Sequence, residues 1–171
     1  MDKQIEIMYS ASAVIWWRYG WRRLRIMRRF LTTQTVWDEC ADHGIEKSML
    51  QMLEEETGIE MSLSGYDKSY HELAYMDGAA WDGKYLSLQQ TVYMHQQQRK
   101  WMAPLLLACI CLSLHRDEHW GADRIARFIA DIDALRQELG EDPKKYTALM
   151  ESETDMRRSD IWAETKSRKE A

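Results

Sequence analysis

The chain has 171 residues, with 23 lysines and arginines against 28 aspartates and glutamates, and a formal net charge of −5. Its 45% hydrophobic content is sufficient for a packed core, which argues against a wholly disordered chain. With only 2 prolines and 8 glycines, it lacks the composition of collagen or of an all-β sandwich rich in tight turns.

The first periodic segment covers residues 13–31. Its apolar side chains recur at three, four and seven residues, as on the buried face of an amphipathic helix. Gly20 lies inside this pattern, so the helix either continues through it or begins there. We expect residues 32–35 to break or cap the helix and residues 36–41 to form a short separate one.

The next two segments differ in character. Residues 46–56 have a helical pattern, and we expect the helix to stop at Gly58. Residues 59–85 contain Gly65 and two Asp-Gly pairs, which favour tight turns. They predict an irregular insertion or a small hairpin.

Residues 86–118 return to a helical pattern, with Pro104 near the middle. Because proline removes an amide donor and clashes with the preceding turn, we expect a kink or two successive helices. Residues 105–114 are apolar on every side, which is typical of a helix at the centre of a bundle.

The last helical patterns cover residues 123–139 and the segment that begins at Asp142-Pro143. Gly140 closes the first, and Asp142 is suited to cap the second. The sequence therefore predicts a mainly α fold: a compact bundle of about six or seven helices with a small insertion. We expect a single domain over residues 1–171, with sub-units 1–58 and 86–160 joined by the insertion at 59–85.

The cysteines and the N-terminus indicate a reducing environment. There are three cysteines, an odd number, and Cys109 and Cys111 are only two residues apart, so no disulfide framework is expected. The N-terminus lacks the pattern of a signal peptide. The longest apolar run, residues 101–114, is shorter than the ~20 residues that span a bilayer. We expect a cytoplasmic protein of the host cell with no membrane contact.

No catalytic motif is recognisable. The sequence has no glycine-rich phosphate loop and no nucleophile elbow. His115 and His119 are four residues apart and could share a helix face toward a metal, but no third ligand is identifiable. They are interpreted as a polar helix end, with metal binding left open. We expect no enzyme activity, no catalytic residues, no cofactor and no metal.

The strongest functional candidate is a stripe of arginines on the predicted 13–31 helix: Arg18, Arg22, Arg25 and Arg29. Residues 1–35 carry a net charge of +5, so the other 136 residues sum to −10. Guanidinium groups bind phosphate and carboxylate alike. Three interpretations stay open: contact with nucleic acid, contact with an acidic protein, and internal pairing with the acidic residues of 38–82.

A second candidate is the acidic middle of the chain, where carboxylates alternate with aromatic residues. Clustered carboxylates can compete for a basic nucleic-acid channel on another protein, because long-range attraction steers the encounter. The predicted partner-binding residues are Glu54, Glu55, Glu56, Asp67, Tyr70, Asp77, Trp81 and Asp82.

Two segments of the chain are similar to segments of known proteins: Trp120-Gly121-Ala122-Asp123-Arg124-Ile125-Ala126-Arg127-Phe128 and Glu55-Glu56-Thr57-Gly58-Ile59. They resemble segments of small helical proteins encoded by phages and prophages of Gram-positive bacteria, most without an assigned function. These motifs are structural and not catalytic. Some phage proteins of this size block host defence.

The resemblance implies a non-enzymatic, phage-derived protein that inhibits a host defence system, such as an anti-CRISPR protein acting on a CRISPR effector nuclease. Its partner would be a host protein or a protein–nucleic acid complex. The alternative is a helical DNA-binding transcriptional regulator that uses the arginine stripe. The abundance of methionine and tryptophan is also compatible with a homo-oligomer.

Overall fold

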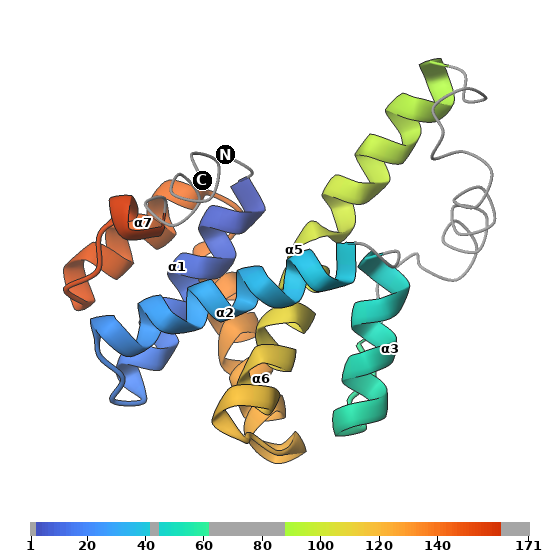
Figure 1. The fold of residues 1–171 in the computed structure, drawn as a ribbon. Coiled ribbons are helices and arrows are strands. Elements are labelled where there is room, and N and C mark those ends of the chain that lie inside the picture. Colours follow the sequence, from blue (N-terminus) through green and yellow to red (C-terminus); the bar gives the residue numbers. More distant parts are fainter. Residues whose placement is uncertain (1–2, 42–44, 62–87, 162–171) are drawn as a thin grey trace, which may run out of the picture.

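The structure is a computed structural model that describes residues 3–41, 45–61 and 88–161, with side chains except at 40–41, 45–48 and 88–101. Figure 1 shows the arrangement of the helices. Within these ranges the protein is helical and has no strand, which confirms the prediction of a mainly α bundle. The helices are α1 (Lys3–Arg18), α2 (Arg23–Ala41), α3 (Ile45–Thr57), α5 (Leu88–Glu118), α6 (Ala122–Leu139) and α7 (Pro143–Glu153).

Two helices supply the centre of the core. Residues 105–114 of α5 are all buried, which confirms the prediction of a central helix there. Residues 6–16 of α1 are also all buried, although no helix was predicted over the first twelve residues. α7 and α6 pack against α1, while α2 and α3 pack against α5 (Figure 1). The core thus combines side chains from both 1–58 and 86–160.

Of the two alternatives at Gly20, a helix that continues over 13–31 is wrong and a helix that begins near Gly20 is close to the structure, because the chain turns there and α2 starts at Arg23. Gly20 has φ of +96°, which glycine adopts without strain. Its N–H donates to the Trp17 carbonyl at 2.9 Å, and the Trp21 N–H donates to the Trp16 carbonyl at 2.9 Å. These are the two hydrogen bonds of a Schellman motif. The accompanying apolar contact is the stacking of the Trp16 and Trp21 rings, 5.1 Å apart.

The predicted break at residues 32–35 and the separate helix at 36–41 are also wrong, because α2 continues through Ala41. The hydroxyls of Thr32 and Thr35 donate to the carbonyls of Arg28 and Leu31, one turn earlier. Bonds of this kind satisfy threonine inside a helix.

α5 is one continuous helix on both sides of Pro104, so the expectation of two successive helices is wrong. Proline leaves the carbonyl four residues earlier without its usual helical donor. The buried run that follows, residues 105–114, packs against α1, α2 and α3 and holds the helix in place.

The predictions for the other helices are confirmed. α3 ends at Gly58, whose φ is +76°, and α6 ends at Gly140, whose φ is +72°. The side chain of Asp142 accepts a hydrogen bond from the Lys144 N–H and caps α7. Of the predicted insertion, residues 59–61 are non-helical, and the rest lies outside the described residues. None of the described helices combines the length and apolar character needed to cross a bilayer.

The segment after α7 returns to the start of the chain. Arg158 Nε donates to Glu6 Oε1 at 2.8 Å, and Thr147 donates to the same oxygen at 2.9 Å. The hydrogen bond from Arg158 is the largest cause of the lowered pKa of Glu6. Met156 and Ile161 are buried, so this segment closes the core over α1.

Candidate arginine-rich binding surface

The four predicted arginines do not form one stripe on one helix. Arg18 ends α1, whereas Arg22 lies in the turn and Arg25 and Arg29 lie on α2. Arg29 points inward and its side chain is only 3% exposed. The expectation of four guanidinium groups on a shared exposed face is therefore wrong.

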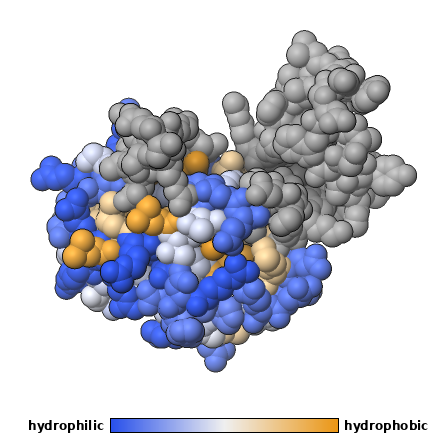
Figure 2. Space-filling model, viewed as in Figure 1, coloured by the Kyte–Doolittle hydropathy of each residue, from blue (hydrophilic) through white to orange (hydrophobic). Residues whose placement is uncertain are grey.

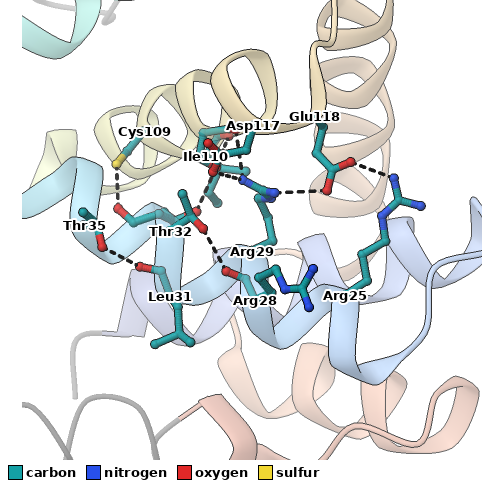
Figure 3. Close-up of polar contacts among 12 residues, drawn as sticks. Arg25, Arg28, Arg29, Leu31, Thr32, Thr35, Cys109, Ile110, Asp117 and Glu118 are labelled. Atoms are coloured by element: carbon teal, nitrogen blue, oxygen red, sulfur yellow. Dashed lines mark hydrogen bonds and ion pairs between the residues drawn. The ribbon is translucent and has the colours of Figure 1, made fainter.

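Arg29 joins α2 to the C-terminal end of α5 (Figure 3). Its Nη1 donates to Asp117 Oδ2 at 2.7 Å and to the Ser113 carbonyl at 3.0 Å. Its Nη2 donates to Glu118 Oε1 at 3.0 Å. Two carboxylates at a helix C-terminus are unfavourable beside the helix dipole, so the buried guanidinium stabilises both. Arg29 therefore has a structural role.

Arg25 reaches one of these two acids, Glu118, from the surface. Its Nη2 donates to Glu118 Oε2 at 2.8 Å, and its guanidinium lies 4.0 Å from the centre of the Trp21 ring. Burial raises the pKa of Glu118, but the hydrogen bonds and charges of Arg25 and Arg29 outweigh it and lower that pKa. Glu118 is thus a carboxylate shared by two arginines.

Arg18 is paired internally as well. Its Nε and Nη2 donate to the two carboxylate oxygens of Glu153, at 3.1 and 2.8 Å. Among the described residues, the carboxylates that pair with Arg18, Arg25 and Arg29 therefore come from α5 and α7. Two described acids of the segment 38–82 pair with Arg116, which contacts Glu56 at 2.8 Å and Glu39 at 3.8 Å.

Other arginines are exposed and have no carboxylate partner in the part of the chain that the structure describes. Arg22 lies 4.4 Å from the Trp17 ring and Arg124 lies 4.9 Å from the Trp120 ring. Arg127 follows one turn after Arg124 on α6. We call Arg22, Arg124 and Arg127 the basic surface.

Aromatic packing joins the α1–α2 turn, which carries Arg22, to the α5–α6 turn, which directly precedes Arg124 and Arg127. The Trp21 and Trp120 rings meet edge to face at 5.8 Å, and Trp120 also contacts Tyr19. The Tyr19 hydroxyl donates to Asp131 on α6. Burial and this hydrogen bond raise the pKa of Tyr19, while the nearby charge of Arg127 acts in the opposite direction.

Sequence reasoning included Arg22 but missed Arg124 and Arg127 as site residues. The available signal was the four-residue spacing from Trp120 to Arg124 across Gly121, which puts an arginine of the first helical turn within reach of the ring that precedes the helix.

The acidic candidate site is described only in part. Glu54 and Glu55 are exposed on α3, whereas Glu56 is paired with Arg116, whose hydrogen bond is the largest cause of the lowered pKa of Glu56. The other predicted residues lie outside the described ranges: Asp67, Tyr70, Asp77, Trp81 and Asp82.

His115 and His119 lie at the C-terminal end of α5. His115 Nδ1 lies 2.8 Å from the Trp120 carbonyl oxygen, which can only accept, so Nδ1 carries the hydrogen. His119 has φ of +56°, unusual for a residue with a side chain. Among the described residues, no three histidine, cysteine, aspartate or glutamate side chains are grouped as metal ligands.

Comparison of the chain with protein-family models, with curated proteins and with solved structures gave no match.

Proposed function

We propose that this protein is a non-enzymatic binding protein that contacts nucleic acid through the basic surface. The observation that carries the proposal is the set of three exposed guanidinium groups without a carboxylate partner among the described residues. Arginine side chains of this kind bind phosphate oxygens by charge and by paired hydrogen bonds.

The tryptophan rings under Arg22 and Arg124 support the same proposal. A guanidinium that rests on an indole face has fewer conformations to lose when it binds an anion. Trp120 is buried and Trp17 is half-buried beneath Arg22, so bases would stack mainly on the guanidinium planes.

The test is a mobility-shift titration with labelled single-stranded and duplex DNA at several salt concentrations. The double variant Arg124→Gln/Arg127→Gln should weaken binding and reduce the salt slope by about one unit per lost phosphate contact. The matched control is Lys144→Gln/Lys145→Gln, which removes the same charge from exposed positions at the start of α7, beyond the far end of α6.

The control should bind like the unmodified protein, because its lysines are not part of the basic surface. Absence of any shift at low salt refutes the proposal. An equal loss in both double variants also refutes it, since net charge and not the basic surface would then govern binding.

A second candidate function is inhibition of a host defence nuclease, such as a CRISPR effector, by an anti-CRISPR mechanism. It is supported by the exposed carboxylates of Glu54 and Glu55 and by the resemblance to phage-encoded proteins.

The test of this second function measures how fast a purified effector nuclease cleaves its target in the presence of the protein. Glu54→Gln/Glu55→Gln should relieve inhibition, whereas Asp133→Asn/Glu138→Gln on α6 should not. Unchanged cleavage in the presence of the unmodified protein counts against this function.

A further inference from the structure

The outward side of α2 carries two leucines that the described residues leave exposed to different degrees. Leu24 is 84% exposed and Leu31 is 36% exposed. Arg28 and Thr35 continue the same stripe, because the positions 24, 28, 31 and 35 follow helical spacing. We call these four residues the outer face of α2.

The opposite side of α2 accounts for the packing of the helix. Ile26, Phe30 and Val36 are buried in the core, and Arg29 and Thr33 face α5. Figure 3 shows Arg28 and Leu31 pointing away from α5, while Arg29 turns toward Asp117. Leu24 therefore contributes little to the attachment of α2 to the bundle, and Leu31 is covered only in part.

The outer face is positive around Arg28, between the two leucines, whereas Asp38, the next position of the stripe, is acidic and lies beyond Thr35. Arg28 is exposed and has no carboxylate partner among the described residues, and Arg25 beside it is half exposed while paired with Glu118. Figure 2 shows that the apolar residues on this side of the molecule form small separate patches in a hydrophilic surround. Two leucines with an arginine between them suit a narrow partner that is both apolar and acidic.

From this juxtaposition we propose that the outer face of α2 is a docking surface for an acidic amphipathic helix of a partner protein. Apolar residues of that helix would cover Leu24 and Leu31, and its carboxylates would pair with Arg28. A nucleic acid backbone offers phosphates to Arg28 but no apolar side chains to the leucines. The proposal does not depend on nucleic-acid binding, because it uses none of Arg22, Arg124 and Arg127.

The probe is a fluorescent synthetic helix of about five turns, with leucines along one side and glutamates on both flanks. Two companion peptides replace the glutamates by glutamine or by lysine. Fluorescence anisotropy should give the tightest binding for the glutamate peptide. Leu24→Gln and Leu31→Gln should each weaken that binding by about tenfold or more, because each removes an apolar contact at the centre of the surface.

A charge reversal gives the sharper test. The Arg28→Glu variant should no longer bind the glutamate peptide and should bind the lysine peptide instead. Lys145→Glu, an equal charge change on α7, should leave the binding of both peptides unchanged. Thermal unfolding should be unchanged by Leu24→Gln, since Leu24 is largely exposed, so lost binding would not reflect misfolding.

Three results would overturn the proposal. One is equal binding of the glutamate and glutamine peptides. Another is binding that survives both leucine replacements. The third is self-association of the unmodified protein in sedimentation that Leu24→Gln abolishes, because the occupant of the face would then be a second copy. Loss of DNA binding in Arg124→Gln/Arg127→Gln with intact peptide binding would support two separate surfaces.

Discussion

Replacing Arg29 by methionine isolates the contribution of the buried guanidinium. Methionine keeps an unbranched apolar stem in the same space but removes the donors to Asp117, Glu118 and the Ser113 carbonyl. Removing one member of a fully buried ion pair costs about 3–5 kcal/mol.

Here the two carboxylates can regain water, since their side chains are 42% and 19% exposed, and Glu118 keeps Arg25. The variant also removes the Arg29 Nε, a buried donor without a partner among the described residues. Both effects reduce the loss, so we expect the free energy of unfolding to fall by about 2–4 kcal/mol.

The assay is urea denaturation followed by circular dichroism, with the slope of the transition checked for constancy. Arg28→Met is the matched control, because Arg28 is the neighbouring exposed arginine and should change stability by less than about 0.5 kcal/mol. A loss for Arg29→Met no larger than that of the control would show that the buried contacts do not stabilise the fold.

Three further predictions concern the charges and the turns. Hydrogen bonds from arginines are the largest cause of the lowered pKa values of Glu6, Glu56 and Glu153. The stability that these ion pairs contribute is therefore complete above the ordinary pKa of 4.5 and is lost as the pH falls through the lower pKa values of the folded protein. Urea midpoints should decrease steadily below about pH 4.5. A constant midpoint in that range would contradict this prediction. Gly20→Ala should destabilise the protein by about 1–2 kcal/mol in the same assay, entirely through backbone strain at φ of +96°, because the added Cβ meets no atom within 4 Å. His119→Gly should raise the unfolding free energy by about 0.5–1 kcal/mol, since glycine adopts the left-handed conformation more readily, and an unchanged or lower value would contradict the strain at this position.

Local patterns predicted the helices whose ends are determined by local chemistry. α6 and α7 have an apolar stripe, a terminal glycine or an Asp-Pro start, and each signal acts within a few residues of its element. The apolar run at 105–114 also indicated its central place in the bundle, because a segment without a polar side is stable only when other elements cover it on all sides.

The wrong or undecided predictions fall at residues whose type fits two different local structures. Gly20 was compatible with a helix interior or a helix end, and the stacking of Trp16 on Trp21 favours the end. Thr32 and Thr35 can cap a helix or bond back within it, and burial of Thr33 against Ser113 favours the continuous helix.

The four arginines of the predicted stripe could be named from the sequence, but their arrangement in space could not. The sequence identified the arginines, yet their partners lie far along the chain: Glu153 for Arg18, and Glu118 for Arg25. Spacing on one helix cannot determine pairs of this kind, because they depend on how the helices are packed.

The position of α1 has a consequence for synthesis of the chain. α1 is buried over residues 6–16 and packs mainly against α7, which begins at Pro143. At a translation rate of 5–20 residues per second, the ribosome makes α7 on the order of 10 s after α1. During that interval an apolar helix lacks its main cover, and Glu6 lacks the hydrogen bond from Arg158. The apolar surface of α1 is therefore exposed to other proteins until the C-terminal third of the chain emerges from the ribosome.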